Sequence, residues 1–284
     1  MKEYDDDTLK RVQKLELSIL KDFINVCEKH NLTYFALAGT GIGALRHKGF
    51  IPWDDDIDVG LPRNDYEKLL TVFQKEYSQK YTVGNAETLQ NYPLMTSRIM
   101  IKGTKFVDES LKNIDCELGI FLDVYAFDNV PDDDKLLKKQ AWSTWFWSKI
   151  LILYYIARPV LPFSGIAKKA AHFLCMVIHG LLKLFRISPH WLYKKCKQAS
   201  TKYNETETKR MAYMCDTNPY INLVNKETSF PLVQYDFEDI KLNFPKDIKE
   251  MLTFVYGDYM QLPPVEKRKN HYPHCLDFGD GKLL

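Results

Sequence analysis

The sequence predicts a mixed α/β fold of the α+β kind, in which a small mixed sheet is flanked by helices and carries a basic helical insertion. Apolar residues recur every three or four positions over 8–30, which predicts an amphipathic helix. Short apolar runs at 34–38 and 57–61 are bounded by glycine, proline and aspartate, which indicates strands. A second helix is expected over 64–77. Further strands are expected near 81–84, 96–101, 105–108 and 119–125.

The middle of the chain differs in charge from the rest. Between Lys135 and Ser200 there are twelve basic residues and no Asp or Glu. The whole chain has a net charge of +2, so the remainder is strongly acidic, with 27 basic residues against 37 acidic ones. We therefore expect one catalytic domain over 1–284, with a helical insertion at 132–210.

The insertion is also rich in aromatic and apolar residues, among them Trp142, Trp145 and Trp147. Its longest uncharged stretch, 170–182, falls short of the roughly 20 residues that a membrane-spanning helix needs, so no such helix is expected. Basic residues among Trp, Phe and Leu are typical of helices that lie on an anionic membrane surface. A helical subdomain packed on the core fits equally well. No nucleic-acid motif accompanies the charge, so nucleic acid is not an expected partner.

The compartment is predicted from the cysteines and the N-terminal sequence. Six cysteines show no regular spacing, which favours a reducing environment. The first residues lack the apolar stretch of a signal peptide. We expect a cytoplasmic protein, peripheral on the inner face of the plasma membrane. His271 and His274-Cys275 lack a second cluster of ligands, so zinc is not expected.

The most informative segment is 37–61, where small residues are followed by a run of acids. If 56–59 is a strand, Asp56 and Asp58 share one face, because strand side chains alternate. Two neighbouring carboxylates repel each other, and a hard divalent cation such as Mg²⁺ removes that cost. The glycines upstream leave backbone N–H groups open to a phosphate. Together these features indicate phosphoryl transfer.

Other interpretations of the acidic run fit less well. A solvated acidic turn does not explain the apolar Ile57 and Val59. A calcium-binding EF-hand register begins at Asp54, but its position 6 is Val59 rather than Gly and its position 12 is Asp65 rather than Glu. A P-loop is excluded because no Gly-Lys-Ser/Thr follows the glycines. The glycine spacing also misses the third position of a Rossmann fingerprint.

Three segments resemble the LicD family. Residues 39–58 read Gly-Thr-x-x-Gly-Ala-x-Arg-His-x-Gly-x-Ile-Pro-Trp-Asp-Asp-Asp-Ile-Asp, which is similar to the signature of that family. Residues 119–128 resemble its strand with a third acid, and 256–268 with His271 resemble its C-terminal signature. The family includes bacterial phosphocholine transferases, is related to fukutin-related protein, and belongs to the nucleotidyltransferase superfamily.

The resemblance implies a nucleotidyltransferase-like mixed sheet and a role for three acids. Asp56, Asp58 and Asp123 would be catalytic and would hold Mg²⁺, with Mn²⁺ as a substitute. Asp123 would also accept the proton of the attacking hydroxyl. Its apolar neighbours imply burial, and a buried acid needs a partner.

The resemblance also implies a site for the donor phosphates. Gly39, Thr40 and Gly43 would line it, and a short helix would begin at Gly43 with its N-terminus toward the anion. Five further residues complete the predicted donor site: Arg46, Lys48, Trp53, Arg268 and His271. Trp53 and Tyr92 are also considered as a cage for a choline ammonium group, against the alternative that they pack in the core.

The implied reaction takes CDP-choline, or another CDP-alcohol, and moves the phospho-alcohol onto a hydroxyl, with release of CMP. The acceptor would be a glycan or lipid-linked glycan, such as a teichoic acid precursor or a lipopolysaccharide sugar. Two alternatives stay open from the sequence. One is a nucleotidyltransferase that releases pyrophosphate, and the other is a non-enzymatic, calcium-dependent membrane-binding protein.

Overall fold

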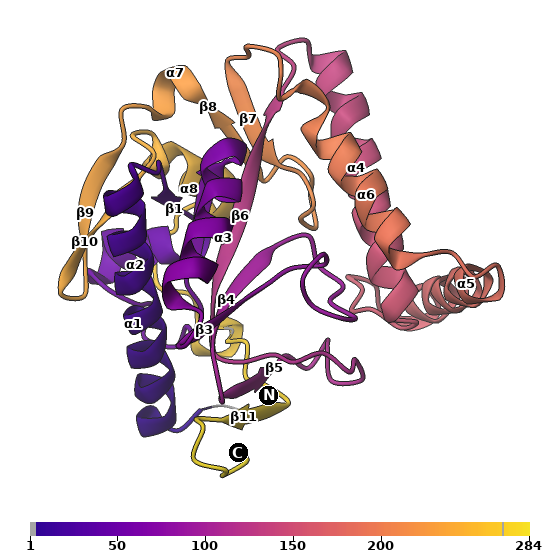
Figure 1. Cartoon of the computed structure of the whole chain (residues 1–284), viewed down its shortest axis with the longest axis horizontal. Coiled ribbons are helices and arrows are strands. Elements are labelled where there is room, and N and C mark those ends of the chain that lie inside the picture. The colour runs from indigo at the N-terminus through magenta and orange to yellow at the C-terminus, as the bar shows by residue number, and fades with distance from the viewer. Residues whose placement is uncertain (1–3, 269) are drawn as a thin grey trace.

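A seven-stranded mixed sheet forms the centre of the computed structural model, which describes residues 4–268 and 270–284 (Figure 1). β2 and β6 run parallel, and the other neighbours are antiparallel. The predicted mixed sheet is therefore confirmed. The strands lie in the order β1 (Phe35–Ala36), β2 (Asp58–Pro62), β6 (Phe121–Val130), β4 (Ser97–Ile101) and β3 (Tyr81–Gly84), and β7 (Arg210–Tyr213) and β8 (Asn222–Asn225) continue from β6.

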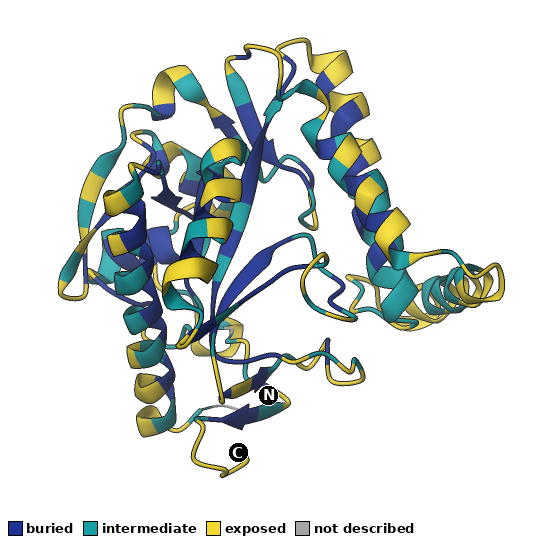
Figure 2. Cartoon of the chain, in the orientation of Figure 1, coloured by how far each residue is buried: buried dark blue, intermediate teal, exposed yellow. Residues whose placement is uncertain are grey.

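Two helices cover one face of this sheet, α1 (Asp6–His30) and α3 (Arg63–Tyr77). α1 begins where the Asp5 carboxylate accepts the Thr8 N–H at 2.9 Å. It ends at Asn31, which adopts the left-handed conformation. Its buried stripe packs against the sheet, so the periodicity of the sequence is confirmed here (Figure 2).

The glycine segment is helical, which corrects the prediction of a turn followed by a helix from Gly43. α2 spans Ala38–His47, and its first helical hydrogen bond runs from the Gly41 N–H to the Leu37 carbonyl at 3.2 Å. A Cβ on Gly43 would overlap the carbonyl oxygen of Gly49. The glycine therefore permits a close approach of two backbone segments, and its own N–H lies inside the helix.

The C-terminal part returns to the core, as expected, but adds elements that the sequence did not predict. α8 (Ile248–Tyr256) ends at Gly257 with a positive φ, and this stop is confirmed. β6 runs to Val130 rather than ending at 125, because its second half pairs with β7. The strand predicted near 105–108 is confirmed as β5 (Lys105–Val107), which pairs with β11 (Cys275–Asp277). The elements that were not predicted include β11, β9 (Val233–Phe237) with β10 (Ile240–Phe244), α7 (Lys226–Ser229), and the 3₁₀ turns Thr201–Tyr203 and Val265–Lys267.

The basic middle segment forms three helices: α4 (Asp134–Tyr155), α5 (Gly165–Leu184) and α6 (Pro189–Ser200). α4 and α6 pack side by side, with Leu151, Leu192 and Tyr193 between them. α5 lies at the far end of this pair (Figure 1). By length and composition α5 is long and apolar enough to cross a membrane.

We expect Gly43→Ala to lower the free energy of unfolding by about 1–3 kcal/mol, because the new methyl group meets backbone that cannot rotate away. Gly180→Ala on α5 is the matched control, since a Cβ there meets nothing within 4 Å. It should be neutral or stabilising by about 0.5–1 kcal/mol. Urea denaturation measures both. Equal effects of the two substitutions would contradict the packing role of Gly43.

Candidate active site

Three charged residues form a row across adjacent strands. Asp58 is the register partner of Asp123, and Asp123 is the register partner of Arg98. Residues paired in this way lie beside one another on the same face of the sheet. The Arg98 Nε donates to the Asp123 carboxylate at 3.0 Å. The sequence predicted the two acids but not Arg98, because only the strand register brings it to them.

Asp56 reaches the same place from the loop before β2. The strand begins at Asp58, so the prediction that both acids alternate along one strand is wrong in this detail. Asp56 and Asp58 nevertheless line one cavity of about 280 Å³, together with Tyr125 and His271. The Tyr125 hydroxyl donates to Asp58 at 3.0 Å, and the His271 Nδ1 lies 3.2 Å from Asp56.

The carboxyl groups of this cavity resist ionisation. Burial raises the pKa of Asp58, and the charges of Asp56 and Asp123 raise it further. Burial raises the pKa of Asp56 to about 6, although His271 opposes the shift. Burial also raises the pKa of Asp123, against the effect of Arg98. The three groups therefore form a concentration of negative charge that a bound cation would stabilise.

A fourth acid, Glu16 on α1, was missed by the sequence analysis. It is completely buried, and neither of its carboxyl oxygens has a hydrogen-bond partner among the described residues. Burial raises its pKa, and the charges of Asp55 and Asp56 add to the shift. One signal could have revealed it, because Glu16 lies in the apolar stripe of α1 between Val12 and Ile19.

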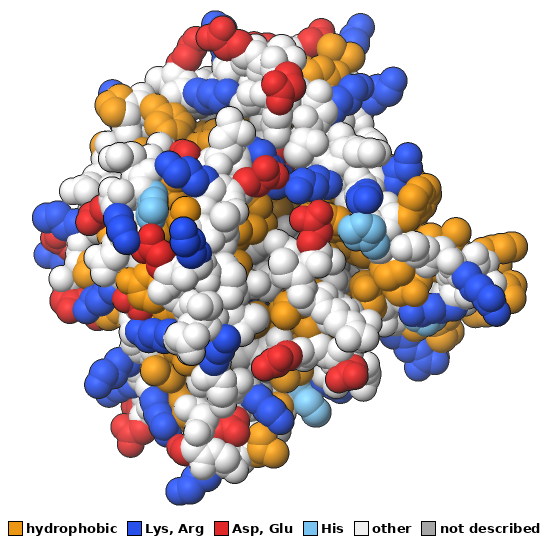
Figure 3. Space-filling view, viewed as in Figure 1, with side chains coloured by type: hydrophobic (Ala, Val, Ile, Leu, Met, Phe, Trp, Pro, Cys, Tyr) orange, Lys and Arg blue, Asp and Glu red, His pale blue; other side chains and the backbone are white. Residues whose placement is uncertain are grey.

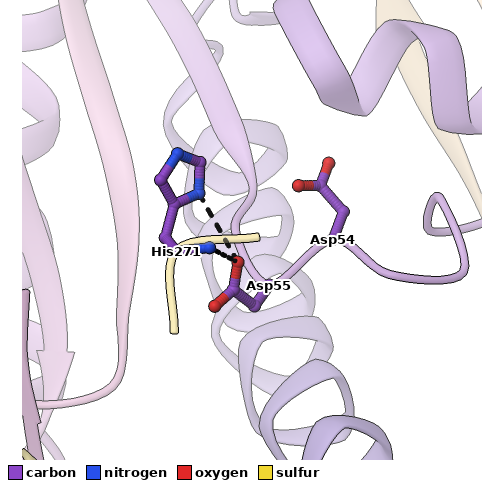
Figure 4. A group of neighbouring side chains, drawn as sticks. All are labelled: Asp54, Asp55 and His271. Atoms are coloured by element: carbon purple, nitrogen blue, oxygen red, sulfur yellow. Dashed lines mark hydrogen bonds and ion pairs between the residues drawn. The ribbon is translucent and has the colours of Figure 1, made fainter. Parts of the chain in front are cut away.

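Asp54, Asp55 and His271 form a group whose ligand atoms lie within 4.8 Å of one another and could hold a metal ion (Figure 4). Asp55 is buried and accepts hydrogen bonds from the Tyr4 hydroxyl at 2.7 Å and the His271 N–H at 2.8 Å. The bond to Asp55 and the charge of Asp56 raise the pKa of His271 to about 10. A protonated imidazole has no free lone pair. His271 therefore forms an ion pair with the acidic segment. Together with Tyr4 it connects both ends of the described chain to this segment.

Three of the predicted donor-site residues do come together. The Arg268 guanidinium lies over the Trp53 ring at 4.4 Å, and that of Arg46 lies 6.0 Å from the same ring. Arg46 also donates to the backbone carbonyls of Tyr259 and Gln261. Burial and the neighbouring Arg268 charge lower the pKa of Arg46. Two cations held this close favour an anionic ligand.

The suggested choline cage does not form. Tyr92 is buried in a core cluster, as the alternative had it. Trp53 already has the guanidinium of Arg268 on its ring. A choline ammonium group would compete with that arginine for the same ring.

Of the other predicted donor residues, some lie beside the acids of the site and one lies away from them. The Thr40 hydroxyl accepts the Asp58 N–H at 2.9 Å and so joins α2 to β2. A Cβ on Gly39 would lie 2.8 Å from the Asp54 carboxylate. Lys48 is exposed at the end of α2, where its charge acts on Asp236 of the β9–β10 hairpin.

Comparisons with known proteins relate this chain to one family. A family described as LicD/FKTN/FKRP, nucleotidyltransferase domain, matches residues 31–149. The lipopolysaccharide cholinephosphotransferase LicD of Haemophilus influenzae is 31% identical over 270 residues, which cover 93% of this chain and 96% of that protein. The chain belongs to the LicD family. Uncharacterized proteins of Rickettsia prowazekii and Rickettsia typhi are each 37% identical, over 23% and 20% of this chain and 24% and 19% of their own lengths.

In this LicD-family chain a second cavity, of about 480 Å³, also has His271 in its lining. Asp108 and His274 line it, and so does Val160, from the segment that joins α4 to α5. Arg98 connects the two regions, because it binds Asp123 and also Asp108 at 2.8 Å. His271 thus lies where the two cavities meet.

The calcium-loop alternative does not fit, because Asp58 begins a strand of the central sheet instead of lying in a loop between two helices.

Arg98→Met should lower the free energy of unfolding by about 3–5 kcal/mol, because Asp123 and Asp108 would lose a partner that is itself buried. Lys241→Met is the matched control, since its ion pair with Asp236 is exposed and such pairs contribute about 0–1 kcal/mol. Chemical denaturation without divalent cations compares the variants. A loss no larger than that of the control would contradict the structural role of Arg98.

The raised pKa of Asp56 predicts a pH dependence. Its folded-state pKa of about 6 exceeds the value of 3.8 expected in the unfolded chain, so the folded state binds the proton more tightly. Asp56 therefore costs stability as the pH rises from 4 to 6, and Asp56→Asn should remove a cost of roughly 1–3 kcal/mol. Unfolding measured in EDTA should show the difference between variant and wild type growing over this range. A difference that does not change with pH would argue against the raised pKa.

Proposed function

We propose that this protein transfers phosphocholine, or a related phospho-alcohol, from a CDP-activated donor to a hydroxyl of a cell-surface glycan or glycolipid precursor, and releases CMP. The observation that carries the proposal is the pairing of Asp58 with Asp123 on parallel strands, with Asp56 and Asp58 on one cavity. The relative named as a lipopolysaccharide cholinephosphotransferase supports it, because the similarity extends over nearly the whole of both chains.

A divalent cation fits the donor set of Asp56, Asp58 and Asp123. Carboxylate oxygens are the ligands that Mg²⁺ and Mn²⁺ prefer. The raised pKa values of all three groups and the unpartnered oxygens of the nearby Glu16 both indicate that ionised carboxylates at this place would gain stability from a counter-ion. When bound, the cation would neutralise charge on the donor phosphates.

The donor phosphates would lie between the start of α2 and His271. Ala38 lines the cavity, and the N–H groups of Ala38, Gly39 and Thr40 precede the first helical hydrogen bond. A helix N-terminus of this kind favours an anion. The His271 side chain is 58% exposed and positively charged, so it can reach the same phosphate.

Arg46, Arg268 and Trp53 would hold a more distant part of the donor. Their two charges favour an anion, and the indole ring offers a flat apolar surface. Gly43 packs against Gly49, and Lys48 faces the β9–β10 hairpin. We therefore assign neither of them to the donor.

Asp123 would take the proton of the attacking hydroxyl. Burial raises its pKa toward the neutral range, where a carboxylate is a more effective base. Arg98 fixes the orientation of this carboxylate through the bond at 3.0 Å. Asp123→Asn should therefore lose turnover.

The test is CMP release from CDP-choline in the presence of Mg²⁺. We expect Asp58→Asn to lower the rate by roughly 10²-fold or more, because one carboxylate of the cavity is lost. Asp236→Asn on the exposed hairpin is the control and should leave the rate unchanged. EDTA should abolish CMP release by the wild type and by Asp236→Asn.

Other products would overturn parts of the proposal. Pyrophosphate in place of CMP would show a nucleotidyltransferase. CMP from another CDP-alcohol but not from CDP-choline would keep the chemistry and change the transferred group. Calcium-dependent vesicle binding without any turnover would indicate the non-enzymatic alternative.

A further inference from the structure

α5 has an unusual distribution of exposed residues. None of its twenty residues is buried in the described structure. Its apolar side chains are among the most exposed of the protein, with Ile166 at 86% and Phe173 at 65% (Figure 2). Figure 3 shows hydrophobic and basic side chains together on the part of the molecule that α5 forms. A contiguous exposed apolar face is rare on a soluble protein unless something binds it.

The exposed apolar residues lie on one face of the helix. Ile166, Phe173, Val177, Leu181 and Leu184 are separated by seven, four, four and three residues, and Leu174 adjoins Phe173, which places the six side chains in one stripe. We call this stripe the outer face of α5, and it consists of Ile166, Phe173, Leu174, Val177, Leu181 and Leu184.

The opposite side of α5 holds the helix against the body of the protein through polar groups and through Leu182, which packs against the cluster of Leu151, Leu192 and Tyr193. His172 contacts the Pro159 carbonyl at 3.0 Å, and His179 contacts the Leu153 carbonyl at 2.8 Å. The Lys183 ammonium lies 3.6 Å from the centre of the Tyr154 ring. An amphipathic helix of a soluble protein turns its apolar side inward. α5 packs inward through Leu182 but also leaves the six apolar side chains of the outer face directed away from the protein.

The charge around the outer face identifies its partner. Lys168, Lys169 and Arg186 are exposed in or directly after α5, and no acid occurs anywhere from 135 to 200. An apolar face bordered by basic residues matches the interface of an anionic bilayer, where acyl chains lie beneath negative headgroups.

We propose that the outer face of α5 docks onto the surface of an anionic lipid bilayer. α5 passes the length and composition test for a membrane span. However, a spanning orientation would place Lys168 and Lys169 about one helical turn inside the apolar layer, where a charge is less favourable than at the membrane surface. It would also break the contacts of His172 and His179 with the backbone beside α4. Lying on the surface keeps both the charges and these contacts.

Docking of α5 would bring the larger cavity close to the lipid. Val160 precedes α5 by five residues and lines the cavity of about 480 Å³ that reaches His271. A lipid-linked acceptor could then enter this cavity directly from the membrane surface, a step that rests on the proposed function. Docking itself does not depend on it.

The test is flotation of the full chain with vesicles made of equal parts phosphatidylcholine and phosphatidylglycerol. We expect the wild type to float with these vesicles, and to float less at high salt or with phosphatidylcholine alone. The double variant Phe173→Glu with Leu181→Glu should lose at least 10-fold in binding, because both side chains are exposed and lie in the outer face. Phe254→Glu on α8 is the matched control, since Phe254 is 80% exposed but lies outside α5.

Four results would overturn the proposal. The wild type could fail to float, or the double variant could float as well as the control. Retention in the membrane after alkaline carbonate extraction would show a spanning helix instead of a docked one. A dimer that depends on Phe173 and Leu181, without flotation, would assign the outer face to a second copy of the chain. CMP release with a soluble acceptor should be the same in all variants, so failure of docking stays distinct from failure of the proposed function.

Discussion

Repulsion among buried carboxylates is the constraint on which the rest of this structure depends. Asp56, Asp58 and Asp123 meet at one end of the parallel pair β2–β6, and the unpartnered Glu16 lies near them. A folded protein leaves such groups together only where another interaction repays the cost. Arg98 and His271 supply part of the compensation, and a divalent cation would supply the rest.

Residues near both ends of the described chain bind the acidic segment 54–58. Asp55 is buried between Tyr4 near the N-terminus and His271 near the C-terminus, and it accepts a hydrogen bond from each. The loop that carries His271 also carries Arg268, which lies on Trp53. Segments that are more than two hundred residues apart thus build one site. The acids of 54–58 organise the fold as well as the chemistry.

Much of this arrangement could be predicted from the sequence. Periodicity located α1 and α3, and the resemblance to the LicD family led to Asp56, Asp58 and Asp123. Arg98 could not be found in this way, because its partner is set by the register between β4 and β6. The glycine segment was predicted as a turn, since a local pattern cannot distinguish a glycine that frees the backbone from one that permits close packing. The hairpin β9–β10 and the strands β7 and β8 were missed for a similar reason, because their pairing is decided by tertiary contacts.

The most direct test is calorimetric titration of the protein with Mg²⁺ at pH 6, in two buffers of different ionisation enthalpy. If the raised pKa values reflect carboxyl groups that lack a cation, binding must release protons, and the observed heat must differ between the buffers. Asp58→Asn should bind more weakly and release fewer protons. Binding without proton release, or binding that is unaffected by Asp58→Asn, would contradict the view that these carboxylates form the cation site.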